Sequence, residues 1–235
     1  MADIRRNNPH LLDEPMWNAL TTAHSHFSTG DGRARAYLPA IGPLSGLAEQ
    51  SPAAYEDLHR LAAPDGIHVL FLQEPPVPRA GWTLIRGGLI DQMVFSGSHL
   101  DPAPHPAGMR LLTAADVPAM VELATLTEPG PFRDRTHELG AFYGITDSGR
   151  LLSMAGQRMR VPGYVEVSAV CTHPDARGRG YARLLMSVVM QIILDAGDTP
   201  FLHTFADNHA AIRVYHALGF EKRHTFHLAV LKKDS

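Results

Sequence analysis

Apolar and polar positions alternate along the chain with two periods, one typical of strands and one typical of helices. Residues 67–72 (Ile-His-Val-Leu-Phe-Leu) and residues 165–172 are rich in β-branched and apolar side chains, as expected for buried strands. Residues 184–193 instead repeat Leu, Val and Ile at helical spacing, so that one face of this segment is apolar. The pattern therefore predicts an α/β (α+β) protein in which helices pack against a sheet.

The N-terminal part of the chain carries fewer and less regular elements. Pro15 and Pro52 mark the starts of two helices, because proline suits the first helical turn. Residues 39–46 are predicted to be a loop. Short strands are predicted at residues 34–38, 67–72, 82–86 and 89–95. We therefore expect an additional N-terminal α/β region over residues 1–100, for which a degenerate second copy of the C-terminal fold is one open possibility.

A proline-rich stretch separates this region from the rest of the chain. Pro102, Pro104 and Pro106 favour an extended connection, so we place a linker at residues 101–108 and a second domain at residues 109–235. The predicted order in the second domain is β-α-β-β-β-α-β-α-β. This mixed order is typical of a central, largely antiparallel sheet flanked by helices. Two arginines of its third strand, Arg158 and Arg160, are expected to face water.

The most informative stretch runs from residue 164 to residue 196. A strand ends at the turn His173-Pro-Asp175, and Arg177-Gly-Arg-Gly-Tyr-Ala182 then leads into the apolar helix. A helix that begins at a glycine-rich turn presents free backbone N–H groups, which together with the helix dipole hold a phosphate. The turn lacks Gly-Lys-Ser/Thr and Gly-x-Gly-x-x-Gly, which excludes a P-loop and the dinucleotide fingerprint. A tight strand-to-helix connection without any ligand is the alternative.

Two motifs resemble those of a known superfamily. The pattern Arg/Gln-x-x-Gly-x-Gly/Ala at Arg177, Gly180 and Ala182 resembles the pyrophosphate loop of the GNAT superfamily of acetyl-CoA-dependent N-acetyltransferases. The preceding Val-Cys-Thr-His-Pro resembles the cofactor strand of that superfamily, and residues 208–220 resemble its next motif, Asn…Ala…Tyr…Leu-Gly-Phe. The resemblance covers roughly residues 109–232 and does not extend to the N-terminal region.

The resemblance implies a GNAT-type fold in which the cofactor strand and the following strand splay apart, with the pantetheine arm of acetyl-CoA between them. Acetyl-CoA would be a co-substrate, and no metal is implied. Backbone groups of Val170, Cys171 and Thr172 would contact the pantetheine amides. Asn208 is implied as a cofactor contact, although helix capping explains it equally well. The residues implied at the pyrophosphate are Arg177, Gly178, Arg179, Gly180, Tyr181, Ala182 and Arg183.

The implied reaction is direct acyl transfer from a thioester to a primary amine. The thioester oxygen needs a hydrogen-bond donor, the amine must lose a proton, and the departing thiolate must gain one. By resemblance, Tyr215 would protonate the thiolate, since a phenol is protonated at neutral pH; a packed core aromatic is the alternative. Glu166 would be the base, unless it pairs with Arg158 or Arg160 across the sheet. His203 is the second candidate base.

The acceptor itself is not specified by these motifs. Residues 128–136 form a loop rich in proline, and the resemblance implies that it lines the acceptor side; a plain surface connection is the alternative. The partner would be a small-molecule or peptide amine. The runner-up function is a non-catalytic acyl-CoA-binding sensor of the same fold, and a longer acyl donor is a further possibility.

The composition of the chain limits the kinds of partner and the cellular compartment that we expect. The chain has 235 residues, 19% charged and 45% hydrophobic, which is typical of a globular protein. A formal net charge of −3 without a long basic run argues against a nucleic-acid partner. The one cysteine, Cys171, allows no intrachain disulfide, and no signal peptide or long apolar run is found, so a cytoplasmic protein without a membrane partner is expected. Monomer and homodimer both remain open.

Overall fold

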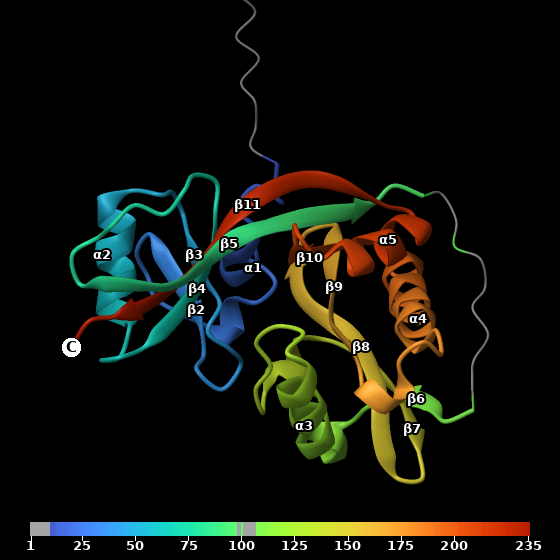
Figure 1. Cartoon of the computed structure of the whole chain (residues 1–235). Helices are drawn as coiled ribbons and strands as arrows, with labels where there is room; N and C mark the ends of the chain where they lie inside the picture. The colour runs from blue at the N-terminus through green and yellow to red at the C-terminus, as the bar shows by residue number, and fades with distance from the viewer. Residues whose placement is uncertain (1–9, 98–99, 101–106) are drawn as a thin grey trace, which may run out of the picture.

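The computed structural model describes residues 10–97, 100 and 107–235 (Figure 1). The small sheet contains β1 (Ser28–Thr29), β2 (Ala34–Tyr37) and β3 (Ser45–Leu47). The large sheet contains, in spatial order, β4 (Ile67–Leu72), β11 (Phe220–Lys233), β5 (Trp82–Phe95), β10 (Thr199–Phe205), β9 (Tyr164–Thr172), β8 (Arg150–Val161), β7 (Phe142–Asp147) and β6 (Met109–Leu111). The α-helices are α1 (Pro15–Thr21), α2 (Pro52–Leu61), α3 (Val117–Thr127), α4 (Tyr181–Asp195) and α5 (His209–Ala217). None of the helices in the described ranges is long and apolar enough to cross a membrane.

The predicted fold class is confirmed. Strands β9 and β10 are parallel, whereas the other neighbours in the large sheet pair in antiparallel fashion. Helix α4 covers one face of the sheet, where its apolar side chains pack on Val165 and Val167. The other face carries α1 against Phe201 and α3 against Ala169. Val165 and Val167 share the core under α4, as strand alternation predicts, whereas Ala169, two residues further on, lies in the core under α3, so the alternation is interrupted between them.

Two predictions for the N-terminal region are wrong in detail. Residues 82–86 and 89–95 form one continuous strand, because β5 pairs with β11 over its whole length and Gly87 and Gly88 continue the ladder. The predicted loop at residues 39–46 ends in β3, which pairs with β2. The helices that begin at Pro15 and Pro52 are confirmed, and the side chain of Ser51 caps the second by accepting from the Ala54 N–H at 3.3 Å.

The large sheet crosses the proposed boundary between the two domains. Strand β5 precedes the boundary, yet it lies between β10 and β11, with Val94 opposite Phe201 and Phe95 opposite Phe220. Figure 1 shows β5 and β11 running side by side from the N-terminal elements towards α5. The division at residues 101–108 stays a prediction, as does the possible second copy of the fold, and residues 101–106 lie outside the described residues.

Strands β9 and β10 separate partway along their length. Within the described residues, their pairing runs from Thr199 opposite Tyr164 to Phe201 opposite Glu166 and stops there. Beyond these positions β9 continues to Thr172 and β10 continues to Phe205. The two strands therefore form a V that opens towards the turn before α4, as the resemblance implied.

Candidate active site

The glycine-rich turn forms an open cradle at the N-terminus of α4. Gly178 and Gly180 both have φ +76°, a left-handed conformation that favours glycine. Gly180 directly precedes the 15-residue helix, and no side chain among the described residues caps the first N–H groups. A Cβ added to either glycine would meet no described atom within 4 Å. The free N–H groups and the helix dipole fit an anion.

Positive charge surrounds this cradle. Arg177, Arg179 and Arg183 are all exposed, and Arg179 also donates to the backbone carbonyl of Asp175 at 3.3 Å. The first helical residues, Tyr181 and Ala182, are half-buried. The predicted pyrophosphate residues therefore lie together on one exposed corner, where guanidinium groups complement the helix terminus.

The predicted cofactor strand contains a backbone irregularity. Ala169 has φ +51°, which is uncommon for a residue other than glycine. The pairing register between β8 and β9 shifts between Gly156 opposite Ser168 and Met154 opposite Cys171. This is a β-bulge, which leaves backbone groups of the bulged strand outside the ladder. The bulge lies in the part of β9 that has separated from β10.

The residues after the bulge contact both cores and the neighbouring strand. Val170 packs towards the α4 side of the sheet, whereas Cys171 lies in the core beneath α3. Burial raises the pKa of the Cys171 thiol to about 11, so it is protonated at neutral pH and is no nucleophile. The Ser153 hydroxyl donates to the Cys171 carbonyl at 2.8 Å and lies 2.8 Å from the Thr172 hydroxyl.

Helix α5 carries the other two predicted residues. Asn208 is exposed, and its side-chain oxygen accepts from the Ala211 N–H at 3.2 Å, so the capping alternative is observed. Tyr215 packs on Phe220 with ring centroids 6.3 Å apart. Burial raises the pKa of Tyr215, although a hydrogen bond with Thr204 opposes this, so the phenol holds its proton at neutral pH. The Tyr215 ring packs against the core on the α4 face of the sheet. The Glu166 side chain lies on the opposite face, where it contacts Arg158 and His203.

Glu166 is fully buried and paired with an arginine. Arg158 donates to it through Nε at 2.8 Å and through Nη2 at 2.7 Å, and the Met159 N–H donates at 3.3 Å. The prediction that Arg158 faces water is therefore wrong. A register shift in β8 between Gln157 and Arg160 turns Arg158 inwards, where its charge compensates the buried carboxylate. Arg160 remains partly exposed and pairs with Asp198 at 2.6 Å.

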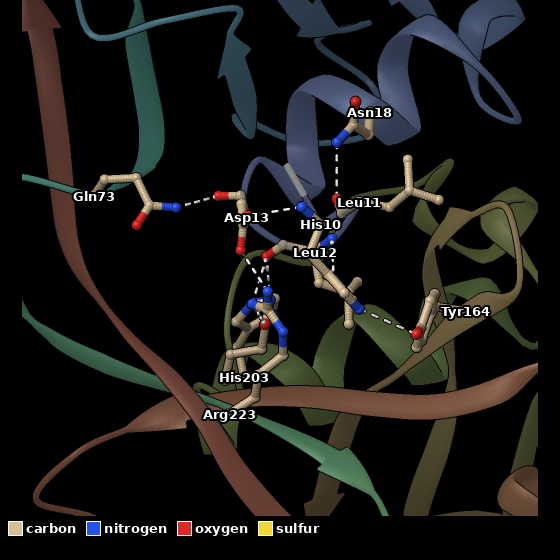
Figure 2. Close-up of polar contacts among 10 residues, drawn as sticks. His10, Leu11, Leu12, Asp13, Asn18, Gln73, Tyr164, His203 and Arg223 are labelled. Carbon is tan, nitrogen blue, oxygen red and sulfur yellow. Dashed lines mark hydrogen bonds and ion pairs between the residues drawn. The ribbon is translucent and has the colours of Figure 1, made fainter. Parts of the chain in front are cut away.

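His203 extends this pair into a network. Its Nδ1 lies 2.8 Å from Glu166, and its Nε2 lies 3.1 Å from the side-chain nitrogen of Gln92. Arg223 donates to the Gln92 oxygen at 2.9 Å and forms an ion pair with Asp13. Figure 2 shows Arg223 and Asp13 facing each other beside His203. Sequence reasoning did not identify Gln92, Arg223 or Asp13, although a glutamine within an apolar strand was a usable signal.

The electrostatics of the network keep Glu166 ionised. Burial alone would raise the pKa of Glu166, but the charge of Arg158 and the hydrogen bonds from Arg158 and His203 lower it to about 2. Burial, helped by Arg158, lowers the pKa of His203, which favours the neutral imidazole. A carboxylate with so low a pKa is a weak base towards an amine.

A narrow crevice lies beside the bulge. Ser168 and Ala169 line one side of it together with Arg158, and residues 129–132 line the other. The loop is bonded to the N-terminal region, because the Thr136 hydroxyl donates to the Ile41 carbonyl at 2.6 Å. The loop that was predicted to line the acceptor side therefore lies directly across the bulged part of β9.

Comparisons with known sequences agree on one kind of protein. The family described as FR47-like protein matches residues 142–228. Curated mycothiol acetyltransferases from Rhodococcus jostii and Tsukamurella paurometabola are 40% identical over 89 residues and 39% identical over 84 residues. These matches cover 35% and 34% of this chain but only 29% and 28% of the relatives. The chain thus matches less than a third of the length of these curated relatives.

Solved structures extend the similarity to almost the whole chain. A structure described as a putative acetyltransferase from the GNAT family, from Novosphingobium aromaticivorans, is 38% identical with a TM-score of 0.88. That similarity covers 97% of this chain and 100% of the other chain, including the N-terminal region. A GCN5-related N-acetyltransferase from Kribbella flavida, 16% identical with a TM-score of 0.62 over 93% and 96% of the two chains, shares the fold.

Proposed function

Because this chain belongs to the GNAT family of acetyltransferases, we propose that it transfers an acetyl group from acetyl-CoA directly to a primary amine. One observation carries the proposal. The open cradle at the N-terminus of α4 lies just after the strand that separates from β10, so a candidate phosphate site and a gap for an extended arm are adjacent. Acetyl-CoA has a pyrophosphate and a pantetheine arm in that order, and its thioester supplies the activated acetyl group.

This geometry supports a set of proposed cofactor contacts. We assign the pyrophosphate to the backbone N–H groups of residues 178–183, with Arg177, Arg179 and Arg183 as the nearby charges. Val170, Cys171 and Thr172 would offer backbone groups to the pantetheine. Asn208 would act mainly by capping α5 and thereby holding Tyr215 in place.

The bulge offers a donor for the reacting carbonyl. Backbone groups at Ala169 and Val170 lie outside the regular ladder, and a backbone N–H placed in this way stabilises charge that develops on a thioester oxygen. Strain of this kind in a residue other than glycine persists where the structure over-determines it, often at functional sites. Tyr215 is our proposed proton donor to the leaving sulfur, since burial keeps its phenol protonated.

Glu166 is our proposed base only through an intermediary. Its carboxylate is fully buried and already accepts from Arg158, Met159 and His203, so direct contact with an amine is disfavoured. The hydrogen-bond network is compatible with transfer of the amine proton to Glu166 through a water molecule or through His203. The same burial also supports the second candidate function, a binding module that holds acyl-CoA without efficient transfer.

Calorimetric titration of acetyl-CoA and of free coenzyme A tests the cofactor assignment. We expect binding of both to the unmodified protein and no binding to Gly180→Glu, which adds bulk and negative charge at the phosphate site. Gly163→Glu is the matched control, because Gly163 has a similar φ of +80°, is equally open and lies at the far end of β9. Binding that survives in Gly180→Glu would contradict the assignment. Thiol release with added amines then separates the enzyme from the binding module.

A further inference from the structure

The imidazole of His203 is enclosed by aromatic rings on the α1 face of the sheet. Its side chain is only 1% exposed. Three aromatic ring centroids lie 4.7–5.9 Å from its own, those of Phe71, Phe201 and Phe226. Among the described residues, Glu166 binds the ring at Nδ1 and Gln92 binds it at Nε2. Because both nitrogens are occupied, the directions of these two hydrogen bonds decide where the ring carries its proton.

The side-chain amide of Gln92 fits its surroundings in one orientation only. Its oxygen accepts from Arg223 Nη1 at 2.9 Å, and its nitrogen donates to the Leu12 carbonyl at 3.1 Å. A guanidinium has only donors and a carbonyl has only acceptors, so the reversed amide would set donor against donor and acceptor against acceptor. Gln92 therefore directs its NH2 group at His203 Nε2, which lies 3.1 Å away.

The orientation of Gln92 determines the tautomer of His203. A ring nitrogen that receives an N–H donor must offer its lone pair, so Nε2 carries no proton. The proton of the neutral ring is then on Nδ1, which donates to Glu166 at 2.8 Å. In an imidazolium, the Nε2 proton would instead face the protons of the Gln92 amide. Burial and the charge of Arg158 also lower the pKa of His203, although Glu166 opposes them.

The segment before α1 keeps Gln92 in this orientation. Leu12 is fully buried and supplies the carbonyl that binds the amide nitrogen. Asp13 pairs with Arg223, which binds the amide oxygen. Figure 2 shows Leu12, Asp13 and Arg223 gathered beside His203. The charges of Asp13 and Arg223 compensate each other, so the segment fixes the amide without adding net charge on this side of the ring.

We propose that Gln92 is a positioning residue that fixes His203 as the neutral tautomer protonated at Nδ1, so that His203 is a hydrogen-bond donor to Glu166 and not the base. This inference rests on the proposed acetyltransferase function and deepens it, because it chooses between the two routes of proton transfer. Nε2 could take the amine proton only if Gln92 turned away and gave up its bonds to Leu12 and Arg223. In the other route, a water molecule accepts the amine proton and passes one of its own to Glu166, and Gln92 stays in place.

The tautomer can be measured in the unmodified protein. Two-bond ¹H–¹⁵N correlations of the imidazole, assigned through ring-to-backbone correlations, distinguish a ring protonated at Nδ1 from one protonated at Nε2. Titratable groups approach this ring from several elements, namely Glu166 of β9, Arg158 of β8, Arg223 and His224 of β11, and Asp13 before α1. We expect only Nδ1 of His203 to be protonated from about pH 8 down to about pH 5.5. Protonation at Nε2, or titration near the ordinary pKa of 6.5, would overturn the inference.

Replacing Gln92 by glutamate should reverse the preference of the ring. The new carboxylate keeps the shape and the bond to Arg223, but it accepts from Nε2, so His203 should become protonated at both nitrogens at neutral pH. Gln73→Glu is the matched control, because Gln73 also donates from its side-chain amide to the segment before α1, at the Asp13 carbonyl. The control should leave the His203 signals unchanged. Equal protonation of His203 in folded Gln92→Glu and in the control would refute the role of Gln92, and if Gln92→Glu does not fold, the spectrum of the unmodified protein decides.

His203→Asn separates a hydrogen-bond donor from a base in the reaction. The asparagine amide can donate to Glu166 from near the position of Nδ1, but it cannot take up a proton. We expect kcat for thiol release to fall by less than about tenfold with acetyl-CoA affinity unchanged, whereas loss of a general base costs about 10²–10⁴-fold. A loss of about a hundredfold or more in a folded variant that still binds acetyl-CoA would make His203 the base and refute the inference. Absence of acetyl-CoA binding to the unmodified protein would instead refute the acetyltransferase function, and the tautomer would still be decided by the spectrum.

Discussion

Replacing Glu166 by glutamine should destabilise the protein strongly. The carboxylate accepts from two nitrogens of Arg158, and the two side chains are 1% and 10% exposed, so solvent screens the pair little. The amide keeps the shape but removes the charge that compensates Arg158. Breaking a buried pair by removing one partner costs about 3–5 kcal/mol. For a chain of this size that loss lowers the melting temperature by about 6–20 °C.

A second arginine–glutamate pair provides a matched control. Arg135 donates to Glu138 through Nε at 2.7 Å and Nη2 at 2.8 Å, which is nearly the same geometry on the surface. Glu138→Gln should change the melting temperature little, because solvent compensates the released charge. Both variants are compared by denaturant and thermal unfolding. If Glu166→Gln unfolds like the control, the buried pair does not stabilise the sheet and the reasoning is wrong.

The same pair sets a pH dependence. The pKa of Glu166 is about 2 in the folded protein, well below the ordinary value of 4.5, so the folded state binds this proton less readily than the unfolded state. A carboxyl group with a lowered pKa contributes stability above about pH 4.5 and loses it as the pH falls towards 2. The stability difference between the unmodified protein and Glu166→Gln should therefore shrink across that window. A difference that stays constant there would refute the assignment of the shift to the ion pair.

Three further predictions concern other parts of the chain. Tyr215→Phe should lower turnover much more than acetyl-CoA affinity, as measured by thiol release and calorimetry; an equal loss of both would remove Tyr215 from the role of proton donor. Glu14→Gln should raise stability at neutral pH. Burial, helped by the charge of Asp13, raises the pKa of Glu14 to about 7. Ionisation of Glu14 in the folded protein therefore costs stability as the pH rises from about 4.5 through 7. The urea midpoint measured from pH 4 to pH 8 tests this, and parallel profiles of the two proteins would contradict it. Residues 109–235 expressed alone should aggregate, because without β5 both β10 and β11 have unpaired edges in the sheet; a soluble fragment with cooperative unfolding would count against this.

The geometry of the proposed cofactor site was predictable because its signals are local. The turn from Arg177 to Ala182 is one contiguous segment. Two of its positions have a left-handed backbone conformation, which favours glycine, and a tight turn of this kind depends on neighbouring residues alone. The helix after it follows from apolar periodicity. For the same reason Asn208 was predictable as a helix cap.

The surroundings of Glu166 and the bulge were not predictable because they depend on distant pairing. The burial of Arg158 follows from a register shift within β8, which strand alternation in the sequence does not reveal. The bulge at Ala169 has no glycine to indicate it. Gln92 reaches His203 only because β5 pairs with β10, and a pairing between strands more than a hundred residues apart has no local signature.

The N-terminal region therefore contributes contacts to the candidate site as well as strands to the sheet. It supplies Gln92 to the network around His203, and its Ile41 carbonyl holds the loop that closes the crevice. The segment before α1 covers the network through the ion pair between Asp13 and Arg223. The motifs proposed for acetyl-CoA lie after residue 160, whereas each of these contacts includes one residue from before residue 100, so the two parts of the candidate site can vary separately. Relatives that share the C-terminal motifs but differ in the N-terminal region should then use the same donor and differ in acceptor.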